Sequence, residues 1–190
     1  MKKFLSQTII ASVLAAALCA QAQPAARVAS TGGKSPHETT SAVIDQNRVT
    51  ITYGRPFTKD PKTGEIRKIW GGLVPYGAAW RMGADEATTL LTQKAIMLGD
   101  TEVPAGAYTL YFVPAESGAS KLAISKTIGQ WGVPVNEKND LARVDVQKAT
   151  AEDKQVDQFT MAVAKNPNGG GLLKWSWENT EYSVPFTVKK

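Results

Sequence analysis

Apolar residues recur at every second position in short runs from Ser41 to the end of the chain. The alternation is plainest in the runs 49–53, 108–112 and 173–177. Successive side chains of a strand point to opposite faces of a sheet, so this period predicts strands that are buried on one face. We therefore expect an all-β fold, an antiparallel, jelly-roll-like β-sandwich of about eight to ten short strands.

Helical patterns are scarce, and we expect at most one or two short helices. Residues 136–142 have a weakly helical pattern, which is too short to connect parallel strands. Pro185 predicts an edge strand or a bulge for the last run, because proline cannot donate a hydrogen bond to a neighbouring strand. Trp175 and Trp177 share one face of their strand, which favours a place in the core over a platform for sugars.

The first 22 residues have the pattern of a secretory signal peptide. Two lysines precede a short apolar run, residues 9–18, and an A-x-A cleavage site follows at residues 20–22. The pattern predicts export, to the periplasm or outside the cell. The apolar run is shorter than the ~20 residues that cross a bilayer, so we expect no transmembrane segment. We expect residues 23–34 to form a flexible leader and residues 35–190 a single β-sandwich domain.

Cysteine and histidine are too rare to support most kinds of catalytic or metal site. Cys19 is the only cysteine, and lipidation there stays open as an alternative, although Leu18 is bulkier than the small residue expected before a lipidated cysteine. Cleavage after Ala22 would leave a product without a thiol nucleophile or a disulfide. His37 is the only histidine, so a histidine triad and a histidine metal cluster are disfavoured. We expect no metal and no cofactor.

The net charge does not indicate a polyanionic partner. Hydrophobic residues make up 43% of the chain and charged residues 21%, as in ordinary globular proteins. The formal charge is +5, and without Lys2 and Lys3 it is +3. This excess is too small to predict a nucleic acid or an anionic membrane as partner. We expect a monomer or a weak dimer.

The stretch from residue 53 to residue 86 lacks strand alternation and concentrates arginines and aromatic residues. Guanidinium groups offer planar, paired donors that match carboxylates and phosphates, and aromatic faces can stack on sugars. We therefore expect a non-catalytic binding or envelope-associated module with a cleft for an anionic or carbohydrate ligand. The candidate ligand-binding residues are Tyr53, Arg55, Arg67, Trp70, Tyr76, Trp80, Arg81, Asp85 and Glu86.

A purely structural role for the same stretch stays open. Arg55 or Arg81 could form an ion pair inside the domain, while Trp70 and Trp80 fill one end of the sandwich. The candidate partners are Asp85, Glu86 and Glu178.

A glycoside or polysaccharide hydrolase is the catalytic alternative. Asp85 or Glu86 would act together with Glu178, and such carboxylates must lie ~5 to 9.5 Å apart. No nucleophile motif is present, so the sequence favours binding over catalysis.

Three long motifs carry a family resemblance. They are Y-x-R-P at residues 53–56, I-W-G-G-L-V-P-Y-G-x-x-W-R-x-G-A at residues 69–84 and P-A-G-x-Y at residues 104–108. The chain resembles a family of exported bacterial proteins known as a domain of unknown function, and departs from its usual pattern at residues 58–68 and at Asp85-Glu86. The resemblance implies a secreted or periplasmic, β-rich domain. It implies no activity, cofactor or catalytic residue.

Overall fold

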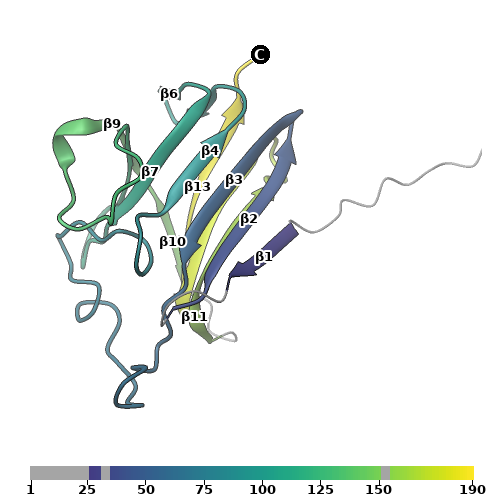
Figure 1. Cartoon of the computed structure of the whole chain (residues 1–190). Helices are drawn as coiled ribbons and strands as arrows, with labels where there is room; N and C mark the ends of the chain where they lie inside the picture. Colours follow the sequence, from purple (N-terminus) through teal and green to yellow (C-terminus); the bar gives the residue numbers. More distant parts are fainter. Residues whose placement is uncertain (1–25, 31–34, 151–154) are drawn as a thin grey trace, which may run out of the picture.

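Two layers of β-strands pack face to face (Figure 1). This computed structural model describes residues 26–30, 35–150 and 155–190. The signal-peptide and Cys19 predictions lie outside the described residues. No helix in the described part of the chain is long and apolar enough to cross a membrane.

The first sheet has seven strands, all paired antiparallel, in the order β1-β2-β3-β4-β7-β8-β9. Its strands are β1 (Ala26–Ser30), β2 (His37–Ile44), β3 (Asn47–Gly54), β4 (Thr89–Thr92), β7 (Gly106–Val113), β8 (Lys121–Ser125) and β9 (Asp140–Asp145).

The second sheet has the order β11-β12-β13-β5-β6, and β10 also pairs with β13. Its strands are β5 (Ile96–Leu98), β6 (Thr101–Val103), β10 (Gln147–Thr150), β11 (Val156–Lys165), β12 (Gly171–Glu178) and β13 (Thr180–Val188). All of these pairs are antiparallel as well. The all-β sandwich expected from the alternation is confirmed.

The number of strands is larger than the eight to ten expected, since the described residues form thirteen. The additional strands include short ones, since β4 and β10 have four residues each. Runs of this length contain too few positions to show an alternation. Strands β4 and β10 are recognisable only from the backbone hydrogen bonds that they make with longer neighbours.

The core lies between the two sheets. Every second residue of β12 is buried, and Leu173, Trp175 and Trp177 are at most 1% exposed. Both tryptophans are therefore core residues, as the shared face predicts. Stacked and edge-on aromatic pairs fill this core, for example Trp175 against Tyr182 with ring centroids 5.7 Å apart.

Three local predictions are wrong. Residues 26–30, expected in a flexible leader, form β1 by backbone pairing with residues 37–41 of β2. The helical pattern of 136–142 produces only the 3₁₀ turn η1 (Glu137–Asn139), after which β9 begins. Pro185 is not at a sheet edge, because β13 lies between β12 and the pair β10 and β5. On one side Pro185 pairs with Leu172 of β12. On its other side it has no partner, because β10 pairs only as far as Ser183 and β5 only from Phe186, so the proline is tolerated.

The segment between β3 and β4 leaves the sheets and extends beyond the ends of the strands (Figure 1). Its β-bridges are isolated: Phe57 pairs with Gln158, Lys59 with Ile66, Trp70 with Val74 and Trp80 with Phe112. This segment, residues 55–88, contains most of the candidate site.

Candidate functional site

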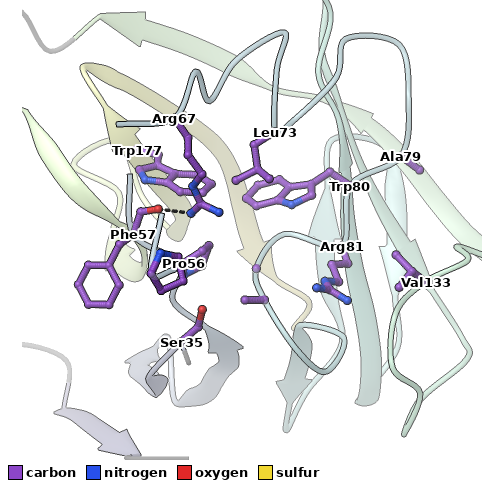
Figure 2. Close-up of a pocket in the computed structure, with 13 residues that line it drawn as sticks. Ser35, Pro56, Phe57, Arg67, Leu73, Ala79, Trp80, Arg81, Val133 and Trp177 are labelled. Atoms are coloured by element: carbon purple, nitrogen blue, oxygen red, sulfur yellow. Dashed lines mark hydrogen bonds between the residues drawn. The ribbon is translucent and has the colours of Figure 1, made fainter. Parts of the chain in front are cut away.

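A pocket of about 290 Å³ opens where the segment 55–88 meets the end of the sandwich (Figure 2). We call it the arginine pocket. Its lining residues are Ser35, Pro56, Phe57, Pro61, Arg67, Leu73, Ala79, Trp80, Arg81, Gly83, Ala84, Val133 and Trp177. Three of the sequence candidates are therefore brought together here: Arg67, Trp80 and Arg81.

Trp80 forms a fixed wall of the arginine pocket. Its backbone N–H donates to the Phe112 carbonyl at 2.7 Å, and its carbonyl accepts from the Phe112 N–H at 2.8 Å. Its ring stacks on Trp177 with centroids 5.8 Å apart and lies edge-on to Phe159 at 4.9 Å. Trp177 is itself held by a hydrogen bond of 3.1 Å from its Nε1 to the Thr58 hydroxyl. These contacts restrict both indoles to one orientation.

Arg67 stands on one side of Trp80 and Arg81 on the other (Figure 2). The Arg67 guanidinium donates to the backbone carbonyls of Phe57 and Thr58. These bonds use two of its five N–H groups. In the described part of the chain, no carboxylate lies within ion-pair distance of Arg67. The pKa of Asp60 is lowered mainly by hydrogen bonds from the backbone amides of Lys62 and Thr63. The nearby charge of Arg67 lowers it further.

Arg81 packs on an exposed tryptophan. Its guanidinium carbon lies 5.9 Å from the ring centroid of Trp131, a cation–π contact. Among the described residues, Arg81 makes no ion pair and no side-chain hydrogen bond. All five of its N–H groups therefore remain available to a ligand.

The loop that carries Arg81 is pinned at several points. After the Trp80–Phe112 pair, residues 81–87 leave β7, and Thr88 returns to accept from the Leu110 N–H at 2.9 Å. The Ala87 N–H donates to the Gln130 carbonyl at 3.1 Å. The loop is therefore a bulge on the side of β7 that pairs with β4, and both of its ends are fixed by backbone bonds.

Close backbone packing behind this loop requires glycine. The Ala84 N–H donates to the Gly54 carbonyl at 3.3 Å, and a Cβ on Gly54 would lie only 2.0 Å from the Ala84 carbonyl oxygen. A Cβ on Gly83 would lie 2.7 Å from the Gly54 carbonyl oxygen. These two glycines let the Arg81 loop lie directly on the end of β3.

Arg55 and Tyr53 lie outside the lining of the arginine pocket, in a buried network. The Arg55 guanidinium donates to Glu38 Oε2 at 2.7 Å, with the two side chains 19% and 4% exposed. It also donates to the Phe159 carbonyl at 3.1 Å and the Thr160 hydroxyl at 2.8 Å, both on β11. Arg55 therefore joins β2 of one sheet to β11 of the other.

Tyr53 completes this network. Its hydroxyl donates to Glu38 Oε1 at 3.0 Å and accepts from the Met161 N–H at 2.8 Å. Burial raises the pKa of Tyr53 above its ordinary value. An internal ion pair for Arg55 was among the expectations, but the partner is Glu38 rather than Asp85, Glu86 or Glu178. Sequence spacing missed Glu38 because it sits across the β2–β3 hairpin, opposite Tyr53.

Trp70 and Tyr76 are packing residues beside the arginine pocket. Trp70 lies edge-on to Trp80 and Tyr182, with centroids 6.5 and 5.3 Å away. The Tyr76 ring covers Gly71, where a Cβ would lie 2.8 Å from its Cε2 atom. Neither residue lines the arginine pocket.

The candidate carboxylates also lie outside the lining. Glu86 Oε2 is 2.6 Å from His37 Nε2, and the pKa of Glu86 is lowered by its own backbone amide and by this contact. Asp85 has a φ of 63° and one buried carboxylate oxygen, Oδ2, without a hydrogen bond. Burial raises the pKa of Glu178 at the end of β12. None of the three lines the arginine pocket, so they do not supply it with an acid and a base.

Several lining residues were not among the sequence candidates. Leu73 and Val133 line the mouth, Phe57 faces Arg67 with its backbone carbonyl, and Trp177 reaches the lining from the core. Val133 comes from the loop after β8, far from the other residues in sequence. No local pattern marks it, because only the packing of that loop on the Arg81 loop brings it to the pocket.

Comparison with known proteins gives one match. The model of a family described as a protein of unknown function, DUF2911, matches residues 35–186. No curated protein and no solved structure matches the chain.

Proposed function

The chain belongs to the DUF2911 family of proteins of unknown function, and from the geometry of its pocket we propose that it is an exported, non-catalytic module that binds a small anionic ligand. One observation carries the proposal. Two guanidinium groups, those of Arg67 and Arg81, line the arginine pocket, and no carboxylate is among its lining residues.

Guanidinium groups that lack an ion-pair partner favour an anionic ligand. Partly buried charges are normally paired with an opposite charge, because desolvation otherwise costs several kcal/mol. Arg55 follows this rule through Glu38, whereas Arg67 and Arg81 have no carboxylate within ion-pair distance among the described residues. A carboxylate or phosphate would accept their free N–H groups in charge-assisted hydrogen bonds.

The lining supports binding rather than turnover. General acid–base catalysis needs a positioned His, Asp, Glu or similar group, and nucleophilic catalysis needs an activated nucleophile. Ser35 is the only hydroxyl-bearing residue of the lining, and no histidine or carboxylate accompanies it there. For this reason we favour a binding module over the hydrolase alternative.

Arg81→Gln is expected to weaken anion binding by about tenfold to a hundredfold, because each charged hydrogen bond contributes ~1.5–3 kcal/mol. Calorimetric titration with hexanoate, glucuronate and inorganic phosphate measures the effect. Arg48→Gln is the matched control, since it removes the same charge from an exposed position at the far end of β3. Binding that is equally weakened by both variants, or unchanged by Arg81→Gln, would contradict the proposal.

Export is tested separately. When the full sequence is expressed in a bacterial host, we expect the protein in the periplasmic or external fraction. Its intact mass should match a chain that begins at Gln23. Replacing Ala20 and Ala22 with leucine is expected to block cleavage and retain the leader. A wild-type product that keeps Met1, or one that begins at a lipid-modified Cys19, would contradict the predicted cleavage.

A further inference from the structure

We infer that the ligand of the arginine pocket is an amphipathic anion, a small carboxylate or similar acid with an aliphatic or aromatic body. The inference rests on the proposed function and names its ligand class. In this arrangement the acid group binds Arg67 and Arg81, and the apolar body lies on the side chains at the mouth of the pocket.

The mouth is built from exposed apolar side chains. Leu73 and Val133 line it and are 43% and 52% exposed; Phe57, 39% exposed, is also a lining residue, but its ring points away from the other labelled side chains (Figure 2). They are three of the eight large apolar side chains that are exposed in the described part of the chain. Exposed apolar side chains gathered at one polar-rimmed site indicate a surface that is covered when a partner binds. Here the charge of the two arginines restricts that partner to an acid.

The same lining is poorly suited to a sugar. Sugar hydroxyls need hydrogen-bond acceptors as well as donors, and arginine side chains only donate. Ser35 is the only lining side chain that can accept a hydrogen bond. One face of Trp80 is already stacked on Trp177, so that face cannot serve as a sugar platform. Anionic sugars would satisfy the arginines but find only Ser35 as a side-chain acceptor for their hydroxyls.

The size of the pocket sets the scale of the ligand. Its volume of about 290 Å³ is at the lower end of the ~300–1,000 Å³ typical of small-molecule sites. One small molecule therefore fills it. A short alkyl chain or a single aromatic ring is the matching apolar body.

Calorimetric titration with four probes separates charge from apolar area: hexanoate, octanoate, hexan-1-ol and glucuronate. We expect octanoate to bind most tightly, with each added methylene improving affinity by up to about fourfold, the equivalent of ~0.8 kcal/mol per buried CH₂. Hexanol lacks the charge and glucuronate lacks the apolar body. Hexanol is expected to bind at least tenfold more weakly than hexanoate, and glucuronate at least tenfold more weakly than octanoate.

Two variants test the two halves of the site. Arg81→Gln is expected to weaken the binding of both octanoate and glucuronate. Leu73→Gln is expected to weaken octanoate binding by about fivefold and leave glucuronate binding unchanged. Ile128→Gln is the control for Leu73, because Ile128 is similarly exposed, at 55%, and does not line the pocket. Thermal unfolding checks that each variant is folded. If Arg81→Gln does not fold, Arg67→Gln and Arg81→Lys take its place.

The outcomes distinguish this inference from the proposed function. Glucuronate that binds as tightly as octanoate, and depends on Arg81, would overturn the amphipathic ligand and leave the anion site standing. Hexanol that binds as tightly as hexanoate would overturn both. The absence of binding by every probe would also overturn both.

Discussion

Replacing Trp177 with alanine is expected to lower the free energy of unfolding by about 3–5 kcal/mol. Trp177 is 0% exposed, stacks on Trp80 and packs against Phe159 with ring centroids 5.7 Å apart. Truncation removes these contacts and the hydrogen bond to Thr58, and leaves a cavity at the end of the core. Urea unfolding, followed by circular dichroism, measures the change.

Trp131→Ala is the matched control for this prediction. Trp131 is 55% exposed, and its one aromatic contact in the described part of the chain is the cation–π pair with Arg81. We expect a loss of no more than about 1 kcal/mol. Trp177→Phe keeps an aromatic ring in the core, so its loss in the free energy of unfolding should lie between those of Trp177→Ala and Trp131→Ala. Equal losses for Trp177→Ala and Trp131→Ala would contradict a structural role for Trp177.

Replacing Arg55 with methionine is expected to lower the free energy of unfolding by about 3 kcal/mol. The substitution removes the ion pair between Arg55 and the Glu38 carboxylate, which is 4% exposed. It also removes the side-chain link from the Arg55 guanidinium to β11, through the Phe159 carbonyl and the Thr160 hydroxyl. Urea unfolding at pH 7 checks the prediction.

A second substitution isolates the buried charge as the cause. Because an ion pair and a well-packed apolar pair can be similarly stable, Arg55→Met combined with Glu38→Leu is expected to recover part of the loss. Arg48→Met, at an exposed position of β3, is expected to change stability by less than about 0.5 kcal/mol. A double variant that is less stable than Arg55→Met alone would show that Glu38 acts through contacts other than this pair.

These predictions assign different roles to Arg55 and Arg81, which the sequence alone does not distinguish. Arg55 is neutralised by Glu38 and joins the two sheets, so its loss should reduce stability. Arg81 has no ion pair among the described residues, so its loss should reduce binding and change stability little. A stability measurement and a binding measurement on both variants therefore separate architecture from site.

The candidate stretch was recognisable in the sequence because it interrupts the strand alternation. Residues 53–86 concentrate arginines and aromatic side chains where neighbouring runs alternate, and three of the candidates chosen there line the pocket: Arg67, Trp80 and Arg81. Which arginine is paired was not recognisable. That depends on the β2–β3 register, which places Glu38 opposite Tyr53, two residues before Arg55.

The amino-acid sequence by itself determined the all-β class, because the alternation of side chains between two faces is a local property of an extended backbone. It also marked the stretch that carries the site. Strands β4 and β10, the partner of Arg55 and the arginine pocket were decided by the tertiary structure. Val133 and Trp177 reach that pocket from segments more than 45 residues beyond Arg81. Only the packing of the two sheets and their connecting loops brings residues so distant in the sequence together. No local sequence pattern predicts that they are neighbours.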